Sequence, residues 1–163
     1  MSTDNLKMLD NITFKTGKGF NEGLYLDVNM HLQLFGADGQ LKDEQFIHNL
    51  VTTAGKNMIA DRLLATPTLG VTTHMAIGTG SPAATLLGVE AARVALTSKG
   101  RAAAVVTMIG DFPAGTGTGA ITEAGCFDVV TANTVNMHLS SSFAAINKLA
   151  ADSLSITWTL TIS

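Results

Sequence analysis

The sequence predicts an all-β protein, an antiparallel β-sandwich with one or two short helices and a jelly-roll-like path. Two long segments, around residues 25–34 and 154–162, alternate strictly between apolar and polar residues. Further apolar and β-branched segments follow at short spacing between glycine- and proline-rich turns. The 163 residues are enough for one domain with a sizeable core and too few for two ordinary ones.

Residues 1–23 differ from the rest and are expected to form an N-terminal arm ahead of a sandwich domain at residues 24–163. Gly17, Gly19 and Gly23 stand among polar residues, and apolar residues such as Leu6 and Ile12 are isolated. The first residues are polar and acidic, unlike a signal peptide. No segment of the chain approaches the ~18 consecutive apolar residues of a membrane span, so no membrane partner is expected.

The first element is a half-buried strand that starts near Tyr25, with its even-numbered residues from 26 to 34 apolar and on one face. Asp38 and Gly39 tolerate positive φ, so a second strand over residues 41–51 is expected to fold back as a hairpin. A short helix is predicted over residues 56–64, before Pro67. Its apolar face holds Ile59 and Leu63, with Met58 and Leu64 on the flank.

Two strands separated by a loop are predicted in the middle of the chain. Residues 73–77 form the first strand, and residues 78–90 are predicted as a loop with a helical turn that carries Glu90 towards Arg93. Residues 102–112 are apolar and β-branched at their centre, which indicates a strand covered on both faces. The glycine-rich residues 113–119 end it.

Three more strands are predicted after this loop. Residues 121–130 and 135–143 form two of them, and residues 145–151 are predicted as a bend. The last strand carries the strongest local signal, because its even-numbered residues from 154 to 162 are apolar and its odd-numbered ones carry hydroxyls. Trp158 belongs to the apolar series and is expected to be buried.

The composition favours a protein that assembles with other subunits. Charged residues make up 14% of the chain, against about 25% in ordinary soluble domains, while hydrophobic residues reach 46%. An uncharged surface is most simply explained by burial between subunits. The net charge is -3 and the ten Lys and Arg residues are scattered, so direct nucleic-acid binding is not expected.

Two glycine-rich segments resemble nucleotide-binding loops in outline only. Residues 78–83 match G-x-G-x-x-A, but Pro82 removes a backbone donor and no acidic residue stands about 20 positions downstream. Residues 115–119 lack the Gly-Lys-Ser or Gly-Lys-Thr of a phosphate-binding loop. No cofactor is therefore expected.

The residues that usually carry chemistry are dispersed. The four histidines, at positions 31, 48, 74 and 138, have no Cys or Glu at metal-ligand spacing. No Gly-x-Ser-x-Gly elbow is present, and Cys126 is expected to be a small buried hydrophobe. Asp111 and Glu123 have apolar flanks but are interpreted as turn or interface charges. The sequence predicts no catalytic site, no metal site and no small-molecule substrate.

From about Asn49 to Ser163 the order of the segments resembles a group of small tailed-bacteriophage virion proteins, of the capsid decoration or cement type or the head or tail fibre type. Cys126 stands where an apolar residue is usual. The pieces that carry the resemblance are Asn49-Leu50-Val51-Thr52-Thr53-Ala54-Gly55-Lys56, Met75-Ala76-Ile77-Gly78-Thr79-Gly80, the turn from Glu90 to Arg93, Phe112-Pro113-Ala114-Gly115, Ile121-Thr122-Glu123-Ala124-Gly125-Cys126-Phe127 and Ser153-Leu154-Ser155-Ile156-Thr157-Trp158.

The resemblance implies a structural protein without catalysis, made in the host cytoplasm. Such a protein forms a small homo-oligomer, most simply a trimer, and binds the major capsid protein lattice on the outside of the virion. Tail, baseplate or fibre location is the alternative, and a carbohydrate-binding module is a further one. The residues expected to contact partners lie in the arm and in two glycine loops; they are Phe14, Lys15, Lys18, Phe20, Thr79, Ser81, Pro82, Pro113, Thr116 and Thr118.

Overall fold

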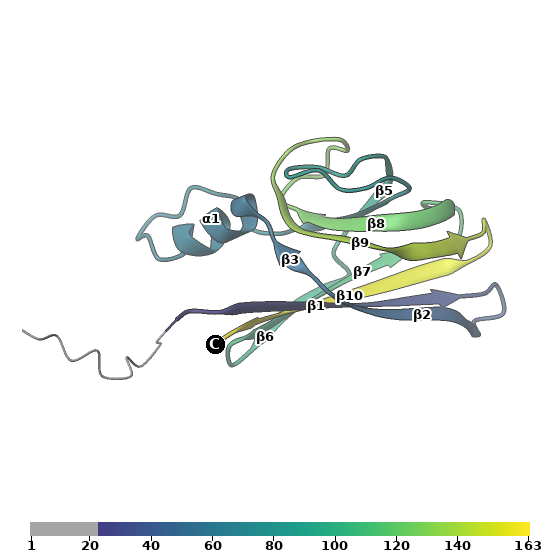
Figure 1. Ribbon diagram of the computed structural model, residues 1–163, viewed down its shortest axis with the longest axis horizontal. Helices are drawn as coiled ribbons and strands as arrows, with labels where there is room; N and C mark the ends of the chain where they lie inside the picture. The colour runs from purple at the N-terminus through teal and green to yellow at the C-terminus, as the bar shows by residue number, and fades with distance from the viewer. Residues whose placement is uncertain (1–22) are drawn as a thin grey trace, which may run out of the picture.

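The computed structural model describes residues 23–163, which form two five-stranded antiparallel sheets packed as a sandwich, with one short helix (Figure 1). Sheet A has the strand order β2-β1-β10-β7-β6 and sheet B the order β3-β9-β8-β4-β5. The predicted antiparallel sandwich is confirmed, while the jelly-roll path stays a prediction. The elements are β1 Leu26–Phe35, β2 Leu41–His48, β3 Leu50–Val51, α1 Thr53–Asp61, β4 His74–Gly78, β5 Glu90–Ala95, β6 Ser98–Ala102, β7 Val105–Phe112, β8 Gly119–Phe127, β9 Met137–Lys148 and β10 Ser153–Ile162.

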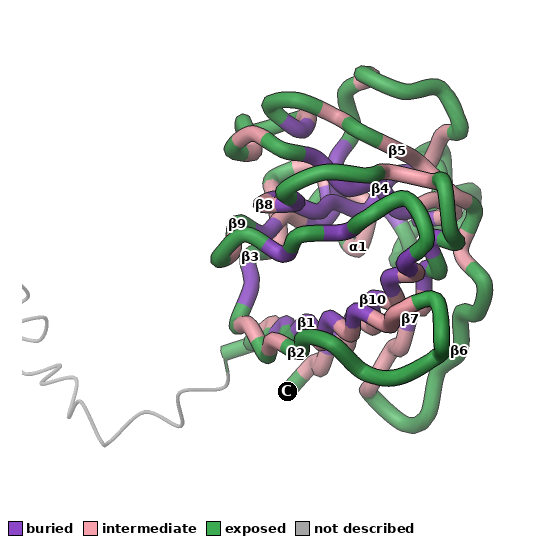
Figure 2. Tube along the Cα trace, turned by 90° about the vertical axis from the view of Figure 1, so that its right-hand side faces the viewer, coloured by how far each residue is buried: buried purple, intermediate pink, exposed green. Residues whose placement is uncertain are grey.

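The two alternating segments pair at the centre of sheet A, as their patterns require. β1 and β10 run antiparallel along their whole length, with Met30 opposite Trp158 and Leu32 opposite Ile156. Their apolar faces are buried against sheet B, and Trp158 is fully buried as predicted. Figure 2 shows buried residues in the strands of both layers.

The predicted hairpin is confirmed, but its second strand is divided between the two sheets. Gly39 has φ +77° in the turn, and β2 pairs with β1. At Asn49 the chain leaves sheet A, with its N–H still donated to Val28 O at 2.7 Å. It then enters sheet B as β3, which pairs with β9 at two positions.

The helix begins three residues earlier than predicted and ends at Asp61, because polar side chains fix both of its ends. Thr52 is the N-cap and accepts from Gly55 N at 3.1 Å. Asp61 accepts from the backbone N–H groups of Thr68 and Leu69, which turns the chain back. Leu63 therefore lies beyond the helix and is exposed, as is Leu64, which corrects the predicted apolar face. Within residues 23–163 no helix is both long and apolar enough to cross a membrane.

Several other details differ from the prediction. Residues 90–95 and 98–102 are strands, and the predicted helical turn before Glu90 does not form. The predicted bend over residues 145–151 is largely strand, since β9 keeps pairing with β8 as far as Lys148. β7 starts at Val105 and buries mainly one face, because no other element of residues 23–163 covers the outer side of sheet A (Figure 1).

Candidate interface loops

Six of the ten predicted contact residues lie on two loops. Thr79, Ser81 and Pro82 belong to the β4–β5 loop, residues 79–89. Pro113, Thr116 and Thr118 belong to the β7–β8 loop, residues 113–118. Pro82 and Thr116 are half-buried, and the other four are exposed. The remaining four predictions, Phe14, Lys15, Lys18 and Phe20, fall outside the described residues.

The start of the β4–β5 loop, at Thr79 and Gly80, lies beside the β7–β8 loop at one end of the sandwich, here called the loop end, while Ser81 and Pro82 lie nearer β3 and the start of α1. A Cβ placed on Gly119 would lie 3.6 Å from Thr79 Cγ2. Thr122, just after the β7–β8 loop, donates its hydroxyl to Gly80 O at 2.7 Å. The opposite end, which carries α1, is called the helix end.

The Glu123 side chain anchors the β4–β5 loop from beneath. The residue is fully buried. Its Oε1 accepts from Gly80 N at 3.0 Å and Val89 N at 2.8 Å, and its Oε2 accepts from Gly88 N at 2.8 Å. Hydrogen bonds to a carboxylate are stronger than those between neutral groups, so three of them fix the path of the loop.

The fit between this loop and the sheet leaves no room for larger side chains. A Cβ on Gly78 would lie 2.4 Å from Glu123 Oε1 and 2.4 Å from Val89 O, so the position requires glycine. Leu87 packs into a small buried cluster on the outer face of sheet B with Ala76, Phe127 and Met137. The loop is therefore held by apolar packing as well as by the buried carboxylate.

A different buried charge anchors the β7–β8 loop. Lys148 Nζ donates to Pro113 O at 3.0 Å and to Asp152 O at 2.7 Å, and Gly115 N donates to Ala150 O at 2.7 Å. Burial lowers the pKa of Lys148, and the nearby Asp152 carboxylate partly opposes that shift. These bonds tie the glycine loop to the turn between β9 and β10.

Asp152 extends this network to the β1–β2 hairpin. Its carboxylate accepts from Lys42 Nζ at 2.7 Å and from Leu149 N at 3.0 Å. The hydrogen bond from Lys42, followed by that from Leu149 N, lowers the pKa of Asp152. Three connections at the loop end are thus joined through two lysines and one carboxylate.

An open pocket of about 700 Å³ lies beside the β4–β5 loop. The predicted contact residues Ser81 and Pro82 form one wall, and the start of β3 forms another. Ser140 and Ser142 of β9 also line it, and its ionisable residues are His48 and Lys56. This lining is rich in hydroxyls and contains no carboxylate, so it offers hydrogen bonds to a partner rather than an acid–base pair.

Three features of the described residues bear on chemistry: the buried cysteine, the absence of a metal-binding cluster and the exposure of the aromatic side chains. Cys126 is buried in the core, as predicted, and burial raises the pKa of its thiol. Residues 23–163 contain no cluster of three His, Cys, Asp or Glu side chains suited to a metal ion. Trp158 is buried, whereas Phe46 is exposed on β2 and stacks on His31 at 4.1 Å between ring centroids.

The interpretation of Glu123 as a turn or interface charge is wrong, because its carboxylate is fully buried and anchors a loop. Sequence reasoning did not identify the second anchor, Lys148. The signal for Glu123 was its place in an apolar β segment, where a carboxylate must find donors. Lys148 gave no comparable signal, because it follows Asn147 in a segment that was predicted to bend. Comparison with protein-family models, curated proteins and solved structures finds no match to this chain.

Proposed function

We propose that the chain is a non-enzymatic structural protein of a tailed-bacteriophage particle, which binds the outside of the assembled capsid and stabilises it as a decoration protein. The observation that carries the proposal is the pair of adjacent loops at the loop end, each anchored by a buried charged side chain. The phage-type order of sequence segments supports the particle, and the low charge of the chain supports assembly.

Anchored loops suit repeated binding to a lattice. A loop that is ordered before binding loses less conformational entropy when it meets its partner. The exposed residues Thr79, Ser81 and Thr118 are uncharged, so they can be buried in an interface without the cost of desolvating a charge. A protein that binds only the assembled shell stabilises that shell by mass action.

The test is binding of the purified chain to empty shells of the phage that encodes it. We expect the protein to sediment with the shells and to raise their temperature of disruption. The variant Ser81→Lys should bind more weakly, since it places a charge in the proposed interface. Ser98→Lys, on the exposed edge strand β6, is the matched control and should bind like the wild type.

Two results would contradict the proposal. If the protein ignores shells but sediments with purified tails, the tail, baseplate or fibre alternative holds instead. If Ser98→Lys weakens binding as much as Ser81→Lys does, the β4–β5 loop is not part of the contact surface.

A further inference from the structure

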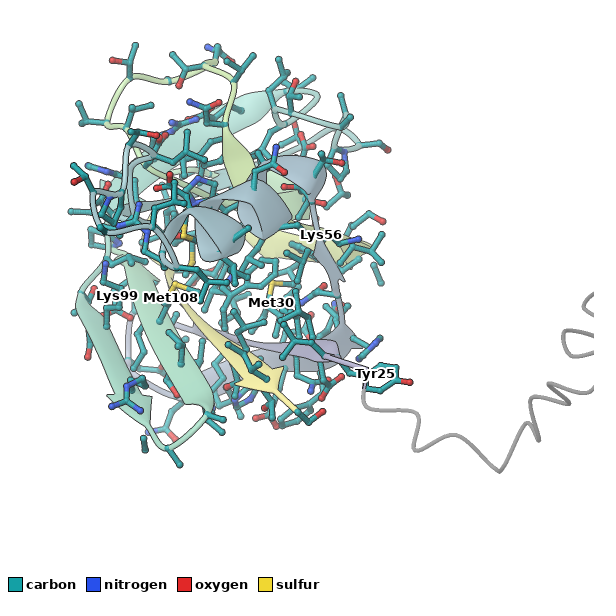
Figure 3. The ribbon with its side chains drawn as sticks, turned by 90° about the vertical axis from the view of Figure 1, so that its left-hand side faces the viewer. Tyr25, Met30, Lys56, Lys99 and Met108 are labelled. Carbon is teal, nitrogen blue, oxygen red and sulfur yellow. The ribbon has the colours of Figure 1, made fainter. Side chains whose placement is uncertain are left out.

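An apolar pocket of about 380 Å³ opens at the helix end, beneath α1, and is here called the helix pocket. Its lining includes Met58 and Ile59 of α1, Leu63, Val106 of β7, and Leu160 and Ile162 of β10. Figure 3 looks onto this end and shows α1 lying across the opening above Met30 and Met108. Exposed apolar pockets of this kind mark interaction sites.

The rim of the helix pocket combines exposed apolar side chains with basic ones. Leu63 is 90% exposed, and Leu64, Leu69 and Val71 are also exposed nearby in sequence. Lys99 and Arg62 line the pocket; Arg62 already pairs with Asp61 at 3.0 Å, whereas Lys99 Nζ donates to Thr72 O at 2.7 Å without forming an ion pair within residues 23–163. A matching ligand would carry large apolar side chains next to carboxylates.

The N-terminal segment of this chain has that chemistry. Leu6, Met8, Leu9 and Ile12 lie between and beside the carboxylates Asp4 and Asp10. Lys7 is the one base among residues 4–14. Residues 13–22 can span up to about 35 Å, which allows the apolar residues to reach a pocket well away from Gly23.

The direction in which the chain leaves the sandwich favours the pocket of another copy. Tyr25 and Ser163 exchange both backbone hydrogen bonds, at 2.6 and 3.0 Å, so the chain continues the line of β1 at the helix end. Leu24 is 74% exposed and Tyr25 57% exposed, so neither side chain folds back beneath α1. Figure 3 places Tyr25 and Lys99 on opposite sides of the opening.

We propose that the helix pocket of each copy receives the apolar residues 6–12 of a second copy, with Asp4 or Asp10 near Lys99. The exchange builds the homo-oligomer that the resemblance to phage virion proteins implies, and in this respect the inference rests on the proposed function. Apolar contacts repeated by symmetry then hold the copies together while the loop ends remain free to meet the lattice.

A cross-linking experiment tests the exchange directly, because Cys126 is buried and is the only cysteine. Full-length Ile12→Cys is mixed with a differently tagged Leu63→Cys variant and treated with a flexible bismaleimide. We expect a covalent product that contains both tags. Leu149→Cys, exposed in the turn between β9 and β10, replaces Leu63→Cys in the control and should give about ten-fold less product or none.

Two outcomes would overturn the inference. A cross-link that forms only within one molecule, in the double variant Ile12→Cys/Leu63→Cys, would mean that the segment occupies its own pocket. Equal products from Leu63→Cys and Leu149→Cys, or none from either, would mean that the pocket does not receive the segment.

A second measurement uses the matched pair Ile12→Asp and Asn11→Asp, which add the same charge at neighbouring positions. Light scattering should show a smaller particle mass for Ile12→Asp and the wild-type mass for Asn11→Asp. Equal masses for the two variants would contradict the exchange. Binding to shells is measured separately. Shell binding without cross-linking would contradict this inference alone. Cross-linking without shell binding would contradict the proposed function alone.

Discussion

Glu90 and Arg93 form a bidentate ion pair that is almost completely buried. Nε donates to Oε1 at 2.8 Å and Nη2 donates to Oε2 at 2.9 Å, with 2–3% of each side chain exposed. The guanidinium carbon lies 3.8 Å from the centroid of the Phe127 ring. Because Glu90 also accepts from Asn133 N, and Arg93 donates to Val129 O, the pair ties β5 to the segment between β8 and β9.

Removal of one partner from this pair should destabilise the fold strongly. Arg93→Met leaves the Glu90 carboxylate buried without its cation, at an expected cost of about 3–5 kcal/mol in the free energy of unfolding. Urea titration measures that cost. The double variant Glu90→Leu/Arg93→Met removes both charges and should lose less than Arg93→Met alone; a larger loss would contradict this explanation.

Glu123→Gln should loosen the β4–β5 loop. One of the two carboxylate oxygens becomes an NH₂ group that cannot accept from a backbone N–H, with an expected loss of about 1–3 kcal/mol. The amide protons of Gly80, Gly88 and Val89 should exchange faster than in the wild type. Asp111→Asn changes an exposed carboxylate that accepts from Ser155 Oγ, and its effect should stay within about 0.5 kcal/mol.

Acidification should weaken the fold through His138. Burial lowers the pKa of His138 below its usual 6.5. The charge of Asp128 partly opposes this shift, and the charge of Arg62 adds to it. The unfolded chain therefore binds the proton first, so the full stability is present above about pH 6.5 and declines as the pH falls towards the folded-state pKa.

The variant His138→Asn isolates this effect. Its side-chain oxygen can accept from Thr72 Oγ1, which lies 2.9 Å from His138 Nδ1. Urea titrations between pH 7 and pH 5 should show a flatter dependence of stability on pH than in the wild type. An unchanged slope would assign the loss of stability to other groups.

Cys126 should be chemically silent in the folded protein. Burial raises the pKa of the thiol and shields the sulfur from reagents. Iodoacetamide at pH 8 should modify the chain in urea but not in buffer, as read by mass spectrometry. If folded wild type reacted as fast as Leu63→Cys does at its exposed site, β8 would be open at Cys126.

The sequence patterns predicted the elements whose faces differ most in polarity. β1 and β10 were located almost to the residue, since each buries one face against sheet B and alternates without interruption. β6 was missed because all five of its residues are exposed, which leaves no apolar pattern to find. β5 was missed because an extra residue, Ala91, stands between the pairs Ile77–Ala92 and Gly78–Glu90, and that irregularity disturbs the period of two.

The loops were recognised as loops, but their anchors could not be predicted. Glu123 reaches Gly80, Gly88 and Val89 from more than thirty positions away. Lys148 reaches Pro113 across a similar distance along the chain. These contacts between residues far apart in the sequence depend on how β8 is aligned with β4 and β9. The secondary-structure propensity of a single segment does not specify that alignment.

The place of β10 has a consequence for synthesis of the protein. β10 lies between β1 and β7 and pairs with both, so these two strands lack the neighbour that joins them until residues 153–162 have left the ribosome. Until then β1, already paired with β2, exposes an apolar face and one unpaired edge, which are features that lead nascent chains to chaperones or aggregates. Slow translation of the last third of the message should therefore lower the yield of soluble protein more than slow translation of the first third.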